Sequence, residues 1–152
     1  MKIEIRWSPP FKLGKYYKLE DPKSLPYGPG IYMFARIYDQ ETKLIYIGKA
    51  LNLKGRVKHQ LKSSHLREKM KSKPGVSRVL FVGKLQTKSG QEVDKALRIV
   101  ESALIAHALD EGHDLVNYQG THISTHKLTF NGNREARNLT GKSMLVRKTS
   151  KG

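Results

Sequence analysis

Four side chains of the sequence have types that could together hydrolyse a phosphodiester bond: Tyr32, Tyr46, Arg56 and Glu101. The reaction needs an activated water, stabilisation of the charge that builds on the phosphate oxygens, and relief for the departing oxygen. A glutamate can hold a hard divalent cation, and the planar guanidinium of an arginine matches phosphate oxygens. A tyrosine with its ordinary pKa of about 10 is a poor base, but neighbouring cations lower that pKa. These residue types fit metal-assisted hydrolysis, provided that the fold brings them together.

Two segments rich in β-branched and aromatic residues carry the tyrosines. The composition predicts a strand over residues 31–38, a polar loop over 39–43 and a second strand over 44–48. Because side chains alternate along a strand, Tyr32 and Tyr46 can share one face of this β-hairpin. Packing within a sheet is the usual role of a strand tyrosine, so the hairpin alone leaves both roles open.

A basic amphipathic helix is expected directly after the hairpin. Apolar residues recur every four positions over residues 53–61, and Arg56 lies beside this stripe rather than opposite it. A second basic helix is predicted over 65–73, followed by a third strand over 78–84. The predicted order up to this point is β-β-α-β.

The longest predicted helix carries Glu101. Residues 89–92 resemble a capping box that opens it, and Gly112 stands near its end. At 100° per residue, Glu101 falls at the boundary of the apolar face, where a carboxylate can be half-buried. A glutamate in that position is usually solvated or salt-bridged, so a catalytic role needs support from its neighbours.

The chain divides into one domain and two arms. Residues 1–27 are broken by prolines and are predicted to form an irregular N-terminal arm. Residues 28–130 are expected to form a single domain, because no linker is long enough to separate two. Residues 131–152 form a basic C-terminal tail, whose composition is typical of a segment that orders only on DNA.

The charge balance indicates a polyanionic partner. The chain has 29 Lys and Arg against 13 Asp and Glu, a formal net charge of +16, which favours nucleic acid over an anionic membrane. Nine of these cations and a single acid, Glu68, lie between Lys49 and Lys73. A basic run alone would indicate only a solvated face, but after the expected site we expect it to follow the phosphate backbone, with the following DNA contacts: Lys49, Lys54, Lys58 and Lys62. Lys49 is also a candidate catalytic residue, either a phosphate contact or a solvated charge.

Several classes of protein are excluded by what the composition lacks. No apolar stretch approaches the roughly 18–20 residues of a membrane span, and the first residues do not resemble a signal peptide, so a cytoplasmic protein without a membrane partner is expected. The absence of cysteine excludes disulfides, zinc ribbons and cysteine nucleophiles. Any metal must be held by oxygen or histidine, and the histidines lack a convincing metal-binding spacing.

Two tripeptides stand on the expected hairpin, Gly-Ile-Tyr at 30–32 and Tyr-Ile-Gly at 46–48, with Arg56 and a helical Glu101 after them. In these features the chain resembles the GIY-YIG nucleases. The run from residue 46 to residue 57 is similar to the same segment of the UvrC-type nucleotide-excision repair nucleases. Either tripeptide alone would be weak, because Gly, Ile and Tyr are ordinary strand and turn residues. Their combination with the arginine and the glutamate is specific.

The resemblance covers about residues 28–118. It implies an α+β domain whose central three-stranded antiparallel sheet is flanked by helices, and the β-β-α-β-α order of the pattern agrees with it. It also implies that Glu101 holds one Mg²⁺ or Mn²⁺ and that Arg56 stabilises the transition state. Tyr32 is then the expected general base and Tyr46 its partner in positioning water and phosphate, although these roles can be exchanged.

Two further positions around the expected site, residues 59 and 117, are compared with the family pattern. The family often has Tyr or His four residues after the catalytic arginine, whereas here that residue is Gln60 and His59 comes one position earlier. His59 is open to two interpretations, a proton shuttle or a bystander on a basic helix. Asn117 fits the asparagine that supports the family's active site and is assigned as a DNA contact.

The favoured function is a metal-dependent DNA endonuclease, with type II restriction preferred because no second large domain is expected and the basic arms could contact the grooves. The alternatives are a structure-selective repair nuclease, a phage or mobile-element nuclease, and a DNA-binding module without catalysis. One active site cuts one strand per binding event, so double-strand cleavage predicts a homodimer on DNA or sequential nicking.

Overall fold

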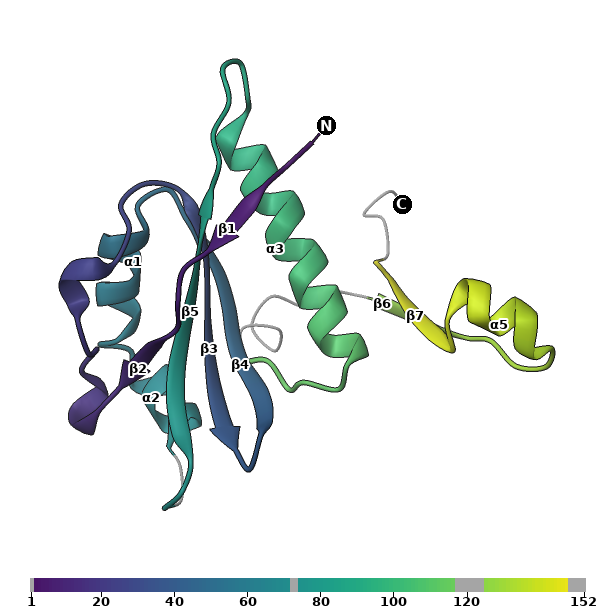
Figure 1. Ribbon diagram of the computed structural model, residues 1–152, viewed down its shortest axis with the longest axis horizontal. Coiled ribbons are helices and arrows are strands. Elements are labelled where there is room, and N and C mark those ends of the chain that lie inside the picture. The colour runs from purple at the N-terminus through teal and green to yellow at the C-terminus, as the bar shows by residue number, and fades with distance from the viewer. Residues whose placement is uncertain (1, 72–73, 117–124, 148–152) are drawn as a thin grey trace.

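A five-stranded antiparallel sheet forms the centre of the fold (Figure 1). The computed structural model describes residues 2–71, 74–116 and 125–147. In it, β4 (Glu41–Ala50), β3 (Gly30–Tyr38) and β5 (Ser77–Leu85) lie side by side in that order. These are the three predicted antiparallel strands, so the α+β class and the central sheet are confirmed.

The sheet is wider than predicted because the N-terminal arm adds two strands. β1 (Ile5–Trp7) and β2 (Phe11–Leu13) pair antiparallel with successive parts of β5. Pro9 and Pro10 separate them, since a proline cannot donate to a ladder. The expectation that residues 1–27 are irregular is therefore wrong in part, and its cause is that three-residue strands are too short to show alternation.

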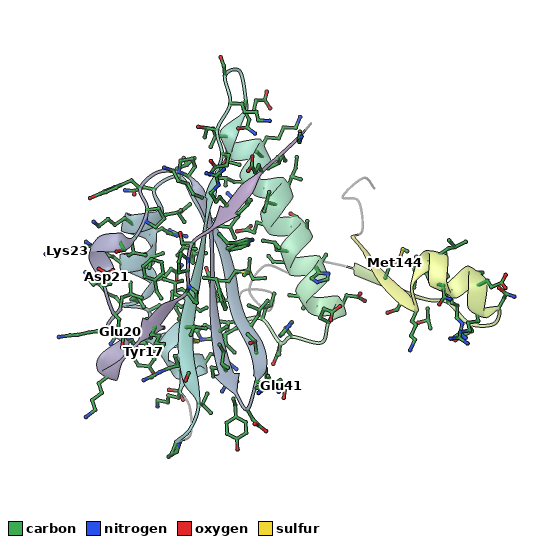
Figure 2. All side chains as sticks on the ribbon, in the orientation of Figure 1. Tyr17, Glu20, Asp21, Lys23, Glu41 and Met144 are labelled. Carbon is green, nitrogen blue, oxygen red and sulfur yellow. The ribbon has the colours of Figure 1, made fainter. Side chains whose placement is uncertain are left out.

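The rest of the arm folds back beside the second helix, α2 (Ser64–Met70). It contains two 3-10 turns, η1 (Lys15–Tyr17) and η2 (Pro22–Ser24). Figure 2 labels Tyr17 on this part of the arm. Its hydroxyl donates to the carbonyl oxygen of Arg67 over 2.8 Å, and the guanidinium carbon of Arg78 lies 4.5 Å from the centre of its ring. These contacts attach the arm to both α2 and β5.

Helices cover both faces of the sheet (Figure 1). α1 (Leu53–Gln60) and α2 pack on the face that carries Tyr32, whereas α3 (Val93–Asp110) packs on the face that carries Ile31. The side chain of Asn52 caps α1 by accepting a hydrogen bond from a backbone N–H of its first turn. Because side chains alternate along β3, Tyr32 and the helix that carries Glu101 lie on opposite faces of the sheet.

The start of α3 differs from the prediction. The helix begins at Val93 behind Glu92, whose side chain makes no cap hydrogen bond, so the capping box expected at residues 89–92 is not formed. Its end agrees with the prediction, because Gly112 adopts a φ of +90° and the next backbone N–H donates to the carbonyl oxygen of Ala108 over 3.0 Å.

The described residues 125–147 form a small unit, so the predicted tail is structured as far as residue 147. It consists of β6 (Thr125–Thr129), α5 (Arg134–Thr140) and β7 (Ser143–Arg147), with the two strands paired antiparallel. The Ser143 hydroxyl donates to the carboxylate of Asp110 at the end of α3 over 3.4 Å. Figure 1 shows the unit projecting to one side of the sheet, next to that end of α3.

Candidate active site

The two glycines of the tripeptides create the space in which the site is built. Tyr32 and Gly48 are direct partners in the β3–β4 register, and a Cβ added at Gly48 would lie 2.5 Å from the Tyr32 ring. At Gly30 an added Cβ would meet the carbonyl oxygen of Gly83 and the side chain of Leu53. The first glycine therefore lets α1 and β5 approach β3, and the second lets the Tyr32 ring lie over β4.

Tyr32 and Tyr46 share a face, as predicted. Their rings are stacked with centroids 5.8 Å apart and an interplanar angle of 16°, and Phe34 meets both edge to face. The two environments differ. Tyr32 is only 1% exposed, whereas Tyr46 is partly exposed beside the same core. Any water that approaches the pair meets Tyr46 first.

Burial makes Tyr32 a weak acid. Removal from water raises its pKa well above the ordinary value, and the neighbouring Tyr46 adds to this rise. The interaction with the Arg56 guanidinium lowers the pKa without cancelling the effect. The same interaction is the main reason that the pKa of Arg56 is raised, so Arg56 stays charged beside the phenol.

Glu101, on α3, is half-buried beside the edge strand β4. Burial raises the pKa of its carboxyl group, while the charge of Lys49 and a hydrogen bond from the Lys49 backbone N–H oppose the rise. The charge of Arg56 also lowers the pKa of this carboxyl group. The carboxylate is thus held against β4, the strand that also carries Tyr46. This position agrees with the prediction that Glu101 lies at the boundary of the apolar face of its helix.

An open pocket of about 470 Å³ lies beside these groups. It is lined by Lys49, Ala50, Leu51, Asn52, Gly55, Arg56, His59, Asp94 and Leu97. Lys49 reaches Asp94 with an Nζ···O distance of 3.7 Å, and Arg98 contacts the other oxygen of Asp94 at 3.2 Å. The pocket therefore presents cations at its wall, which suits a phosphate.

Gln60 is a site residue that the sequence analysis did not assign. Its amide nitrogen donates a hydrogen bond to the Tyr46 hydroxyl over 3.1 Å. The signal was its position four residues after Arg56, where the family often has a tyrosine or a histidine. His59 instead lies exposed at the pocket wall and has no contact that distinguishes a proton shuttle from a bystander.

The predicted DNA contacts lie on and around α1. Lys58 and Lys62 are exposed, and Lys54 touches the phenol of Tyr27. Asn117 lies outside the described residues. Their roles remain predictions, because the structure contains no nucleic acid.

The described residues contain no cluster of three or more His, Asp or Glu side chains that could hold a metal ion. One half-buried carboxylate, that of Glu101, still fits Mg²⁺, which commonly takes one or two carboxylates and keeps several waters. Asp94 of α3 lines the pocket itself and is engaged by Lys49 and Arg98. Of these two carboxylates, Glu101 is the one predicted as a metal ligand. Among the described helices, none is both long and apolar enough to span a membrane.

A buried phenol, a permanent cation and a half-buried carboxylate thus lie close together beside a cationic pocket. Residues 28–105 match the UvrC-like GIY-YIG domain, and the chain belongs to this family of GIY-YIG nucleases. Hydrolysis of nucleic acid with DNA as the substrate is the activity that the domain implies. Neither the curated proteins nor the solved structures contain a match to the chain.

Proposed function

We propose that the protein is a metal-dependent DNA endonuclease. The observation that carries the proposal is the convergence of groups from four elements: Tyr32 on β3, Tyr46 on β4, Arg56 on α1 and Glu101 on α3. Arg56 interacts with Tyr32, and Glu101 is bound by the backbone of Lys49. A module that only bound DNA would not need a carboxylate held in this way against the repulsion of phosphates.

Each requirement of the reaction has a candidate in this chain. Glu101 would hold one Mg²⁺ or Mn²⁺, which when bound supplies a Lewis acid for the phosphate oxygens and the leaving group. The exposed guanidinium of Arg56 binds the phosphate and stabilises its developing charge. Lys49, whose side chain is 31% exposed, adds a second cation at the pocket wall.

The burial of the tyrosines favours an exchange of the two expected roles. A general base must reach the water whose proton it takes, and a raised pKa makes the buried Tyr32 hydroxyl reluctant to ionise. Tyr46 is more accessible and is oriented by Gln60. We therefore propose that Tyr46 positions and deprotonates the water, while Tyr32 holds Arg56 in place.

Replacement of each tyrosine by phenylalanine separates these roles. Tyr46→Phe is expected to lower kcat by about 10²- to 10⁴-fold, the usual contribution of a general base. Tyr32→Phe keeps the ring stack and should lower kcat less. Single-turnover cleavage with saturating DNA measures both. A larger loss for Tyr32→Phe than for Tyr46→Phe would restore the original assignment.

Metal dependence is the direct test of the proposal. Purified protein treated with EDTA should not cut supercoiled plasmid DNA, and Mg²⁺ or Mn²⁺ should restore nicking or linearisation. Cutting that is unchanged by EDTA would contradict metal dependence. DNA binding without cleavage in the presence of every divalent cation tested would contradict the proposal that the protein is an enzyme.

Type II restriction remains the proposed biological role, and the basic C-terminal unit with its exposed α5 could supply contacts to a groove. Cleavage-site sequencing on a complex DNA library tests it, because a fixed palindromic site supports restriction and cuts confined to gaps or junctions refute it. Sedimentation on DNA would show whether two copies assemble there. Structure-selective cleavage is the second candidate, favoured by the surroundings of Tyr27.

A further inference from the structure

Tyr27 is an aromatic side chain in an unusual position, directly before the turn that starts β3. It is 67% exposed, so it does not serve the core. The Nζ atom of Lys54 lies 4.6 Å from the centre of its ring and 3.0 Å from its hydroxyl oxygen, to which it donates a hydrogen bond. Such a cation–π contact favours one orientation of the ring over the others.

The same elements that build the catalytic site hold Tyr27. The backbone N–H of Leu53, the first residue of α1, donates to the carbonyl oxygen of Gly28 over 2.9 Å. Gly28 has a φ of +87°, a conformation that glycine adopts without strain. The ring is therefore tied to α1, and Lys54 stands only two residues before Arg56 on that helix.

α1 forms a ridge between Tyr27 and the pocket. At 100° per residue, Gly55, Arg56 and His59 fall on the flank that lines the pocket, and Lys54 and Lys58 fall on the other flank. A helix with its side chains is about 10–12 Å across, a distance that a few nucleotides of one strand, at about 3.4 Å each, can span. A strand bound at Arg56 can thus continue over α1 to Tyr27.

The surface of this ridge combines a row of cations with an exposed aromatic ring. The two amides of residues 52–62 are both engaged, Asn52 with the N–H of Gly55 and Gln60 with the Tyr46 hydroxyl. Asn and Gln amides read paired adenines in a groove, whereas unpaired bases stack on aromatic faces beside a cationic track. The composition of the ridge matches the second mode.

We propose that Tyr27, oriented by Lys54, is a stacking platform for an unpaired nucleotide of the bound strand, a few nucleotides from the scissile phosphate. The inference rests on the proposed nuclease function and deepens it by naming the substrate feature that the protein prefers. A gap, flap or bubble offers such a nucleotide directly. An intact duplex must first be opened, so the platform supports structure-selective cleavage, the second candidate.

Binding in EDTA tests the platform apart from cleavage. The full chain is titrated against a duplex and against the same duplex with a short single-stranded gap, and 2-aminopurine in the gap reports stacking by the quenching of its fluorescence. Tyr27→Ala should weaken binding to gapped DNA by about 5- to 150-fold, which corresponds to about 1–3 kcal/mol for one base, and should leave 2-aminopurine unquenched. Tyr27→Phe keeps the ring and should resemble the wild type on both readouts.

Tyr38→Ala is the matched control, because Tyr38 is 59% exposed at the far end of β3. It should bind both DNAs as the wild type does. The platform would be overturned if Tyr27→Ala lost equal affinity for duplex and gapped DNA, or if it bound gapped DNA as tightly as the Tyr38→Ala control. It would also be overturned if the wild type did not quench 2-aminopurine. Failure of the proposed function would look different, since it would leave Tyr27-dependent binding intact while no divalent cation supported cleavage.

Discussion

Replacing Glu101 with glutamine is expected to lower kcat by about 10²- to 10³-fold or more, because the neutral amide cannot hold the cation that stabilises the transition state. Glutamine keeps the size of the side chain and an acceptor for the Lys49 backbone N–H. DNA binding in EDTA should therefore be retained. Glu111→Gln, at the exposed C-terminal cap of the same helix, is the matched control and should cut at the wild-type rate.

The same substitution should raise the thermal stability of the metal-free protein. The pKa of Glu101 is raised in the folded state, so its protonated form favours folding and this contribution is lost as the pH rises through the raised pKa. Near neutral pH the ionised carboxylate thus costs stability that glutamine does not. The difference in Tm between variant and wild type should close as the pH falls below about 4, the ordinary range of the group. A glutamine variant that still cuts DNA, or that melts earlier than the wild type at neutral pH, would contradict this account.

Arg56→Lys is expected to lower kcat by about 10²- to 10³-fold although the charge is kept. The planar fork of arginine can contact the Tyr32 hydroxyl and a phosphate at once, whereas a lysine offers a compact point charge. Because Arg56 is exposed, the fold should tolerate the change. Single-turnover rates with saturating DNA separate this loss from weaker binding.

Lys43→Arg is the matched control, since Lys43 is exposed near the start of β4 and does not line the pocket. It should leave the single-turnover rate unchanged. A lysine at position 56 that kept more than a tenth of the activity would show that charge alone suffices there.

The hairpin and the amphipathic helices could be predicted because their signals are local. Alternation placed Tyr32 and Tyr46 on one face, and apolar spacing placed Arg56 beside the core-facing side of α1. The N-terminal strands could not be predicted, because pairing with β5 rather than their own three-residue pattern makes them strands. The structure within residues 131–147 could not be predicted for a related reason, since β7 is a strand through its pairing with β6.

The residues of the site were easier to predict than their burial and their tendency to ionise. Residue type and spacing indicated Glu101 and Arg56, but the depth of Tyr32 depends on Gly48 beneath its ring and on α1 above it. These contacts join residues far apart in the chain, and they set which tyrosine ionises with difficulty. The hydrogen bond from Gln60 to Tyr46 likewise depends on how α1 sits against β4.

The two N-terminal strands also determine how much chain the nuclease domain needs. The family match begins at residue 28, yet Phe11 and Leu13 are buried and β5 has its outer edge covered by β1 and β2. A chain cut back to the matched segment would present an unpaired apolar edge, which invites other chains to add strands and aggregate. Solubility of the domain is therefore set by residues outside the motif that defines its chemistry.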